Sequence, residues 1–355
     1  MLIVVAHVER RRERRGVPRV LWYVDPRVET MRAQVDALRR LDYPTARLVA
    51  GGRIEVDDGF PEPPARGYRL FLWALRNCDI VILSPDRSLL RDTPLAYHEL
   101  QLLRKARRKV VVLPHGPEVW LPSRARDLLL KHAVSVEQPA YARAEGERRR
   151  ELEYVLANAD VVVSGADWVD SMPWWDSLSA LPFAVDVDEW KPVASERGAA
   201  SLAVLHVRNG EPRGTEFLVE ACNALAEVDL KVVDQPNAQE RRQLIAESDI
   251  VAEQFVSGWY GPLAVEAMSM EKPVLSYLRD DLRELYVLFS FAEGCPVVSA
   301  APEEVEARLR ELASDRERRE DLGRRGREYV REHHSLEAAA ATLDEMFKTL
   351  WAVPA

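Results

Sequence analysis

Short apolar runs alternate with longer segments rich in arginine and glutamate along most of the chain, and this alternation limits the fold more than any other feature. The run at 109–113 is continuously apolar after its lysine, which is typical of a strand buried on both faces. The segment 95–104 has the composition of a helix packed on one side. Strands and helices in regular alternation predict an α/β fold with a doubly wound parallel sheet.

The alternation runs through two successive series. The first series ends near residue 163, and the second begins at 201, after the proline-containing segment 182–192. A chain of 355 residues is long enough for two domains. We therefore expect two Rossmann-like domains that face each other across a cleft, with ligands bound beyond the carboxyl ends of the strands.

The charge and the cysteines exclude several classes of protein. The chain has 49 basic and 58 acidic residues, a net charge of −9, so no nucleic-acid partner is expected. Most arginine runs are interleaved with glutamate and are interpreted as solvated helix faces, with contact to a membrane surface or an acidic ligand as the less favoured alternative. No apolar run reaches the ~18–20 residues that span a bilayer. The three cysteines lie far apart, which disfavours disulfides and zinc sites and predicts a cytoplasmic protein.

The segment 257–275 is the most informative for function. It predicts a turn flanked by Gly258 and Gly261 that leads into a short helix. Glycine lets the backbone approach a ligand closely, and the start of a helix offers free N–H groups to an anion. Glu266 lies about one turn into this helix, where it could accept hydrogen bonds from hydroxyl groups. A plain connection between a strand and a helix is the alternative interpretation.

The sequence Gly258-Trp-Tyr-Gly261, followed by Glu266-Ala-Met and Lys272-Pro-Val, resembles the donor-sugar loop of a bacterial subgroup of retaining glycosyltransferases of family 4, which have the GT-B fold. The resemblance implies that Glu266 holds the ribose of a nucleotide. It also implies that the loop around Gly261 contacts the transferred sugar and the diphosphate. The family has a further glutamate that falls at position 258, where this chain has glycine. Glu253 lies upstream and would need a different loop path to replace it.

Two other segments are similar to the same family. The segment 206–216 resembles the part that clamps the diphosphate, with Arg213 in place of the usual lysine and Arg208 as a second cation; two exposed loop arginines are the alternative. His115 follows the strand at 109–113, where the family has a histidine beside the transferred sugar; a structural histidine is the alternative. The implied catalytic residues are His115, Arg213 and Glu266. The implied donor-binding residues are Arg208, Gly258, Tyr260, Gly261, Leu263, Ala264 and Glu118.

The resemblance also implies a domain order and the absence of a metal. The implied parts are an N-terminal acceptor-side domain at 1–187, a nucleotide-sugar domain at 188–328 and a helix at 329–355 that crosses back to the first domain. Asp186-Val-Asp188 has the spacing of a metal site in glycosyltransferases of another fold, but it resembles the interdomain linker of GT-B enzymes. No metal and no cofactor are therefore expected, since the nucleotide sugar is a substrate. His333 and His334 are expected at an exposed helix end.

The predicted function is transfer of a sugar from a nucleotide-diphosphate donor to an acceptor, with the anomeric configuration retained. The acceptor class stays open between a small molecule, a lipid and a polysaccharide, because the glycine-rich loop expected after the first strand is replaced by residues 25–29. Two alternatives remain. One is a non-hydrolysing sugar-nucleotide epimerase, and the other is a non-catalytic paralogue that binds a nucleotide sugar.

Overall fold

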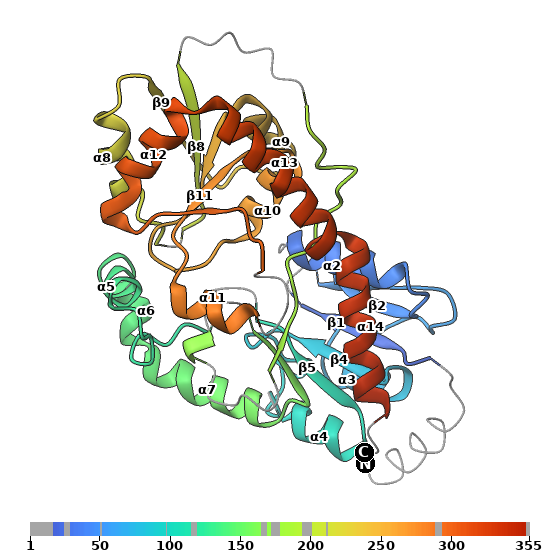
Figure 1. Ribbon diagram of the computed structural model, residues 1–355. Helices are drawn as coiled ribbons and strands as arrows, with labels where there is room; N and C mark the ends of the chain where they lie inside the picture. Colours follow the sequence, from blue (N-terminus) through green and yellow to red (C-terminus); the bar gives the residue numbers. More distant parts are fainter. Residues whose placement is uncertain are drawn as a thin grey trace. The chain divides into compact units, whose positions relative to one another are not determined.

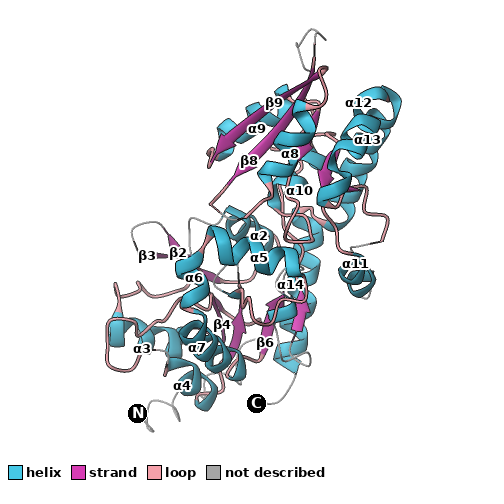
Figure 2. Cartoon of the chain, turned by 90° about the vertical axis from the view of Figure 1, so that its left-hand side faces the viewer, coloured by secondary structure: helices cyan, strands magenta, loops and turns pink. Residues whose placement is uncertain are grey.

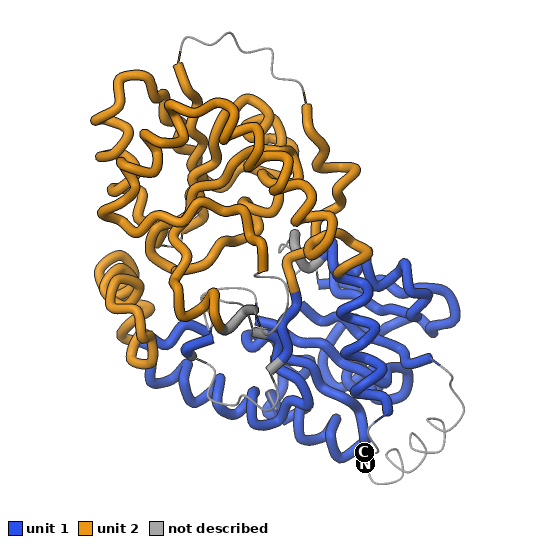
Figure 3. Tube along the Cα trace, in the orientation of Figure 1, with its two compact units in different colours: residues 1–121, 144–181, 339–355 blue, residues 122–143, 182–338 orange. Residues whose placement is uncertain are grey.

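The structure is a computed structural model (Figure 1), in which helices and strands alternate along the chain (Figure 2). It describes residues 17–24, 29–49, 52–96, 98–114, 119–164, 169–171, 178–193, 201–210, 212–287 and 293–352. The chain forms two compact units (Figure 3). The N-terminal unit comprises residues 1–121, 144–181 and 339–355, and the C-terminal unit comprises residues 122–143 and 182–338. The domain bounds expected from the sequence put residues 122–143 in the N-terminal domain, whereas they belong to the C-terminal unit.

The N-terminal unit is built on a seven-stranded sheet. The strands are β1 (Val20–Tyr23), β2 (Thr45–Val49), β3 (Arg53–Val56), β4 (Ile80–Leu83), β5 (Lys109–Val112), β6 (Val161–Ser164) and β7 (Leu178–Ala180), in the order β3-β2-β1-β4-β5-β6-β7. Every neighbouring pair is parallel except the antiparallel pair β2–β3. The helices of this unit are α2 (Glu29–Arg39), α3 (Gly67–Asn77), α4 (Glu99–Lys105), α7 (Glu145–Ala157) and most of α14 (Leu336–Ala352).

The C-terminal unit has a five-stranded sheet in which all neighbouring pairs are parallel. The strands are β8 (Leu202–Arg208), β9 (Val228–Asp234), β10 (Ile250–Ala252), β11 (Val274–Ser276) and β12 (Val298–Ser299), in the order β12-β11-β10-β8-β9. The helices are α5 (Leu128–Glu137), α6 (Pro139–Arg143), α8 (Thr215–Asn223), α9 (Ala238–Glu247), α10 (Pro262–Ser269), α11 (Asp280–Val287), α12 (Val305–Ser314) and α13 (Arg316–His333). The two units confirm the predicted architecture of two α/β domains with parallel sheets.

Helix α14 completes the core of the N-terminal unit, although it follows the whole C-terminal unit in the sequence. Its buried apolar residues pack with those of β1, β4, β5 and α2; they are Leu343, Met346, Phe347 and Leu350. Tyr43 donates a hydrogen bond to Asp344 with a length of 2.8 Å, and its ring meets the ring of Phe347 edge-on, with centroids 5.5 Å apart. These contacts fix α14 to the first unit by both apolar packing and a polar bond.

Two glycines let α13 pack closely on the end of α10. A side chain at Gly323 would overlap the backbone carbonyl of Glu271, with the carbonyl carbon only 2.9 Å from the added carbon. A side chain at Gly326 would lie 3.2 Å from Met268. Alanine is the better helix former, so glycine at these positions reflects packing rather than helix propensity. In the part of the chain that the structure describes, no helix is both long enough and apolar enough to cross a membrane.

Candidate functional site

Three loops meet at the carboxyl edge of the C-terminal sheet, because the parallel strands β8, β10 and β11 all end there. Backbone hydrogen bonds join the loops to one another. The amide of Phe255 donates to the carbonyl of Arg213 (2.8 Å), and the amide of Tyr277 donates to the carbonyl of Gln254 (2.8 Å). The amide of Arg279 donates to the carbonyl of Gly258 (2.9 Å). The loop at 253–261 is therefore held on both sides.

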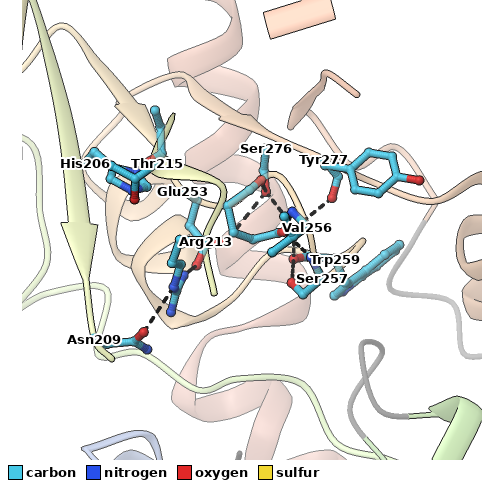
Figure 4. Close-up of polar contacts among 12 residues, drawn as sticks. His206, Asn209, Arg213, Thr215, Glu253, Val256, Ser257, Trp259, Ser276 and Tyr277 are labelled. Atoms are coloured by element: carbon cyan, nitrogen blue, oxygen red, sulfur yellow. Dashed lines mark hydrogen bonds and ion pairs between the residues drawn. The ribbon is translucent and has the colours of Figure 1, made fainter. Parts of the chain in front are cut away.

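Arg213 and Glu253 form a buried ion pair in the centre of this edge (Figure 4). The Arg213 side chain is 11% exposed and that of Glu253 is 1% exposed. Arg213 also donates from Nε to Asn209 at 3.1 Å. The same Glu253 oxygen lies 2.8 Å from the position that a side-chain carbon on Gly261 would occupy. One carboxylate oxygen thus contacts the Arg213 guanidinium and lies against the start of α10.

The loop path brings Glu253 against the start of α10 at Gly261, a contact that the sequence does not predict. The residue follows β10 directly, and its backbone amide donates to the carbonyl of Leu275 at 2.9 Å. The signal that the sequence offers for Glu253 is its position as an acidic residue directly after the apolar strand β10. Its partner could not be read from the sequence, because Arg213 lies in a different loop.

Arg208 is paired elsewhere. It lies opposite Asp234 in the β8–β9 ladder and donates two hydrogen bonds to that carboxylate, at 2.8 and 2.7 Å. Both side chains are about half exposed or more, at 49% and 66%. The two arginines predicted to clamp a diphosphate are therefore each bound to a different carboxylate.

Gly258 has a left-handed backbone, with φ +86°. A side chain there would meet Arg279, whose Cγ would lie 2.6 Å from the added carbon. Arg279 is buried and donates to Asp281 from Nε and Nη2, at 3.0 and 2.7 Å. These hydrogen bonds lower the pKa of Asp281. The aliphatic part of Arg279 thus takes the space in which a glutamate at position 258 would begin.

Gln254 organises the turn that precedes Gly258, and the sequence analysis did not identify it. Its side-chain oxygen accepts hydrogen bonds from the amides of Val256 (2.8 Å) and Ser257 (2.7 Å). Its side-chain nitrogen donates to the carbonyls of Trp259 and Tyr277. A buried amide has two acceptor and two donor positions, so one side chain can satisfy several backbone groups of a tight loop. The loop conformation therefore depends on Gln254.

Glu266 lies in α10 and is bound by Arg241 of α9. Arg241 Nε donates to Oε2 and Nη2 donates to Oε1, both at 2.7 Å. The pair is largely buried, with side-chain exposures of 16% for Arg241 and 9% for Glu266. Leu263 and Ala264 lie in the first turn of α10 and are buried. The helix starts at Gly261 with Pro262 in its first turn.

The side chain of Tyr260 is buried and directed away from solvent. Its hydroxyl lies 2.9 Å from the hydroxyl of Tyr329 and 3.0 Å from Nε2 of His334. Nδ1 of His334 lies 2.8 Å from the carbonyl of Phe183, to which it donates, so Nε2 accepts from Tyr260. Burial lowers the pKa of His334 to about 4 and raises that of Tyr329. The expectation of an exposed position for His334 was wrong, because its ring is buried between two partners that are distant in sequence, Tyr260 and Phe183.

His206 is a second buried histidine at this edge. Nδ1 lies 2.9 Å from the carbonyl of Ala252, and Nε2 lies 2.9 Å from the hydroxyl of Thr215. Burial lowers the pKa of His206 to about 4, so the ring is neutral at pH 7. It joins β8, β10 and the start of α8, whereas the sequence gives it no role of its own within the segment 206–216.

Two predicted site residues, His115 and Glu118, lie outside the described residues. Asp186, the first residue of the D-x-D sequence, accepts hydrogen bonds from the amides of Asp188 (2.9 Å) and Glu189 (3.3 Å), as in a turn. Among the residues that the structure describes, no group of three or more histidine, cysteine, aspartate or glutamate side chains is placed to hold a metal ion.

The arrangement offers two kinds of recognition at one edge of a sheet. Arg213 and the start of α10 offer positive charge and N–H groups, which suit an anion. The ionised carboxylate of Glu266, which Arg241 binds through both oxygens, offers only acceptors, and these suit hydroxyl groups. A ligand with an anionic part and a polyhydroxyl part matches both.

Known proteins are similar to this chain mainly in fold. A family model described as glycosyl transferase-like matches residues 220–345, a span that includes Arg241, the loop at 253–261 and Glu266. No curated protein matches the chain in sequence.

Several solved structures match almost the whole chain. A sucrose-phosphate synthase from Thermosynechococcus elongatus has 14% identity and a TM-score of 0.62, over 94% of this chain and 99% of that one. HepE from Anabaena, in complex with UDP-glucose, has 12% identity and a TM-score of 0.59, over 93% and 99%. A UDP-N-acetylglucosamine 2-epimerase has 12% identity and a TM-score of 0.51, over 94% and 96%. These matches confirm the predicted GT-B fold.

Proposed function

We propose that this chain is a glycosyltransferase that moves a sugar from a nucleotide-diphosphate donor to an acceptor. The observation that carries the proposal is the contact of one Glu253 oxygen with Arg213 and its position beside the start of α10 at Gly261. Arg213 and the start of α10 both lie beside this part of Glu253. A donor diphosphate that binds here would therefore be within reach of both. The glycosyl transferase-like family model, which covers the donor loop, and the resemblance of that loop support the same function.

In this proposal the chain acts by binding and by electrostatic stabilisation. Departure of the sugar leaves negative charge on the diphosphate, and Arg213 and the α10 amides would stabilise that charge. Glu266 would hold the ribose, and the roles proposed for His115 in catalysis and for Glu118 in donor binding rest on the resemblance alone. Retention of the anomeric configuration is proposed on the resemblance of the donor loop. No metal is required for diphosphate departure in this scheme, so EDTA should leave the transfer rate unchanged.

The acceptor is proposed only as a class, which is a small molecule, a lipid or a polysaccharide with a free hydroxyl. The donor is proposed to be a nucleotide sugar, in line with the UDP-glucose bound by HepE. The UDP-N-acetylglucosamine 2-epimerase shares the fold, and a UDP-sugar is part of its name. A binding assay alone therefore does not separate transferase from epimerase, and the product must be identified.

The first experiment is a thermal-shift panel with UDP-, GDP-, ADP- and dTDP-sugars, followed by NMR of the products. Transfer predicts release of the nucleoside diphosphate and a glycoside with the anomeric configuration of the donor. An epimerised nucleotide sugar would favour the epimerase, and binding without turnover would favour a non-catalytic paralogue. The absence of binding by every nucleotide sugar would contradict the proposal.

The second experiment replaces Arg213. Removing it alone would leave the Glu253 charge buried without its main partner, a change that commonly costs about 3–5 kcal/mol of stability. The double variant Arg213→Met with Glu253→Gln avoids this cost, and Glu253→Gln alone is its control. We expect transfer by the double variant to fall about 10²–10³-fold relative to the control, with a similar melting temperature. Equal rates in the two variants would contradict the role of Arg213.

A further inference from the structure

Arg241 joins three parts of the C-terminal unit through one guanidinium group. Its Nε and Nη2 bind the two oxygens of Glu266 on α10. Its Nη1 donates to the carbonyl of Pro236, in the loop after β9, at 3.1 Å. Its Cζ lies 5.6 Å from the ring centroid of Trp190. The guanidinium therefore has fixed partners around its plane and little freedom to turn.

The geometry of this pair decides what Glu266 can do. A bidentate guanidinium fixes the plane of the carboxylate and favours its ionised form. Each oxygen then keeps acceptor capacity for one further donor, and neither can donate. A carboxylate held in this way is suited to two neighbouring hydroxyl groups. The 2′- and 3′-hydroxyls of a ribose are such a pair, whereas a 2′-deoxyribose has only one of them.

We propose that Arg241 is a positioning residue that holds Glu266 as a fixed double acceptor for the ribose of the donor, so that the site selects ribonucleotides over 2′-deoxyribonucleotides. This inference rests on the proposed function, because it assumes that Glu266 meets a nucleotide. Arg241 does not itself contact the reacting atoms. It acts through the orientation and charge of Glu266.

The neighbouring residue Arg242 is a matched control. It lies on the same helix, and its Cζ is 6.0 Å from the ring centroid of Trp190, close to the distance for Arg241. Its ion pair is with Glu189 at 3.4 Å, and its side chain is 37% exposed. Replacing Arg242 removes a cation from the same helix and the same ring without changing the contacts of Glu266.

The experiment measures the binding of UDP, GDP and ADP, each beside its 2′-deoxy counterpart, by calorimetry. The wild-type protein should bind one ribonucleotide about tenfold or more tightly than the deoxy form. Arg241→Met should weaken ribonucleotide binding about 10–100-fold and bring the ratio of the two affinities close to one. Arg241→Lys should not restore the ratio, because an ammonium group cannot bind both oxygens in the same plane. Arg242→Met should behave like the wild type.

A second variant covers the case in which Arg241→Met does not fold. Arg241→Met with Glu266→Gln removes the unpaired charge, and it should fold and show an affinity ratio close to one. In steady-state kinetics with the donor, the folded Arg241 variant should have a raised KM and a kcat changed much less, as expected for lost ground-state binding. A purely structural role would lower the melting temperature and leave the affinity ratio unchanged.

The outcomes separate this inference from the proposed function. A wild-type protein that binds nucleotides without preferring the ribose form would overturn the inference and leave the proposed function standing. A folded Arg241 variant with the wild-type ratio would overturn it as well. A wild-type protein that binds none of the nucleotides would overturn the proposed function and the inference together.

Discussion

At the scale of single residues, one backbone angle decides what position 258 can carry. The φ of +86° at Gly258 is in the region that L-residues adopt only with strain. The stem of Arg279 fills the space beside the Cα atom, and Asp281 holds the Arg279 head group. A glutamate at 258 would meet both obstacles at once. The glycine is therefore part of a consistent local structure, and a glutamate introduced at position 258 should not raise activity.

This argument gives a prediction for Gly258→Ala. The backbone strain costs about 1–2 kcal/mol, and displacing Arg279 adds about 1–3 kcal/mol. Gly294→Ala is the matched control, because Gly294 also has a positive φ (+70°) but no atom within 4 Å of the added carbon. Urea unfolding should show a larger loss in the free energy of unfolding for Gly258→Ala than for Gly294→Ala. Equal losses would mean that Arg279 gives way without cost.

At the scale of elements, the end of α13 is tied to the loop at 253–261 and to the segment 182–187. His334 accepts from Tyr260 of the loop and donates to the carbonyl of Phe183. The amide of Val185 donates to the carbonyl of His334 at 2.8 Å, and Val185 forms a parallel bridge with Ser335. The chain passes between the units at four places, and two of them, at 181/182 and 338/339, lie close to this junction in sequence. The junction is polar, buried and dependent on a neutral imidazole.

The junction predicts a dependence of stability on pH. The pKa of His334 is about 4 in the folded protein, compared with an ordinary value of 6.5. As the pH falls, His334 therefore binds a proton in the unfolded chain before it does so in the folded protein. The stabilisation that is complete above pH 6.5 is lost as the pH falls towards 4. The loss is about 3 kcal/mol for this histidine, at about 1.36 kcal/mol per pKa unit.

His334→Gln tests this prediction, because glutamine can both donate and accept but does not titrate. The free energy of unfolding of the C-terminal unit is measured in urea at pH 7.5, 6, 5 and 4, with hydrogen exchange of α13 as the probe. These values give the slope of the free energy of unfolding against pH. The variant should lose about 3 kcal/mol less than the wild type between pH 7.5 and 4. His206, whose pKa is also about 4, is present in both proteins and cancels in the comparison. A wild-type slope in the variant would rule out His334 as the cause.

Elements could be predicted from the sequence where local pattern decides them. The run at 109–113 forms a parallel strand as predicted, because burial on both faces requires continuous apolar residues. The antiparallel strand β3 was not predicted, since it is short and only partly buried. The association of 122–143 with the C-terminal unit was also not predicted, because local periodicity does not report which surface a helix packs on.

The candidate site was predictable in its elements but not in its pairings. The turn at 258–261, the helix start and the place of Glu266 on that helix follow from glycine spacing and from the resemblance. The partners Arg241, Glu253 and Arg279 were missed, because charge pairs between separate loops leave no periodic signal in the sequence. The burial of His334 is not predictable for the same reason, since its hydrogen-bond partners Tyr260 and Phe183 lie far away in the sequence.

At the scale of the whole molecule, each unit has its own core, and the one in the N-terminal unit depends on α14. Phe347 is fully buried in that core, and truncation of a buried phenylalanine costs about 3–5 kcal/mol. Phe347→Ala should therefore destabilise the N-terminal unit, although residue 347 follows the whole C-terminal unit in the sequence. Leu309→Ala, in the core of the C-terminal unit, is the control. Hydrogen exchange should show loss of protection in β1 and β4 for the first variant and in β8 and β10 for the second. Loss in both units from Phe347→Ala would contradict this division.

The position of α14 in the sequence also has a consequence for synthesis on the ribosome. Domains usually fold in the order in which they are made, at about 5–20 residues per second. Here the N-terminal unit lacks part of its core until residues 339–352 have been made, after the whole segment 182–338. Its apolar sheet face therefore stays uncovered for roughly 8–30 s, until its last helix has been made. During that interval the C-terminal unit can fold first, and the earlier half of the chain is the part that needs protection from aggregation.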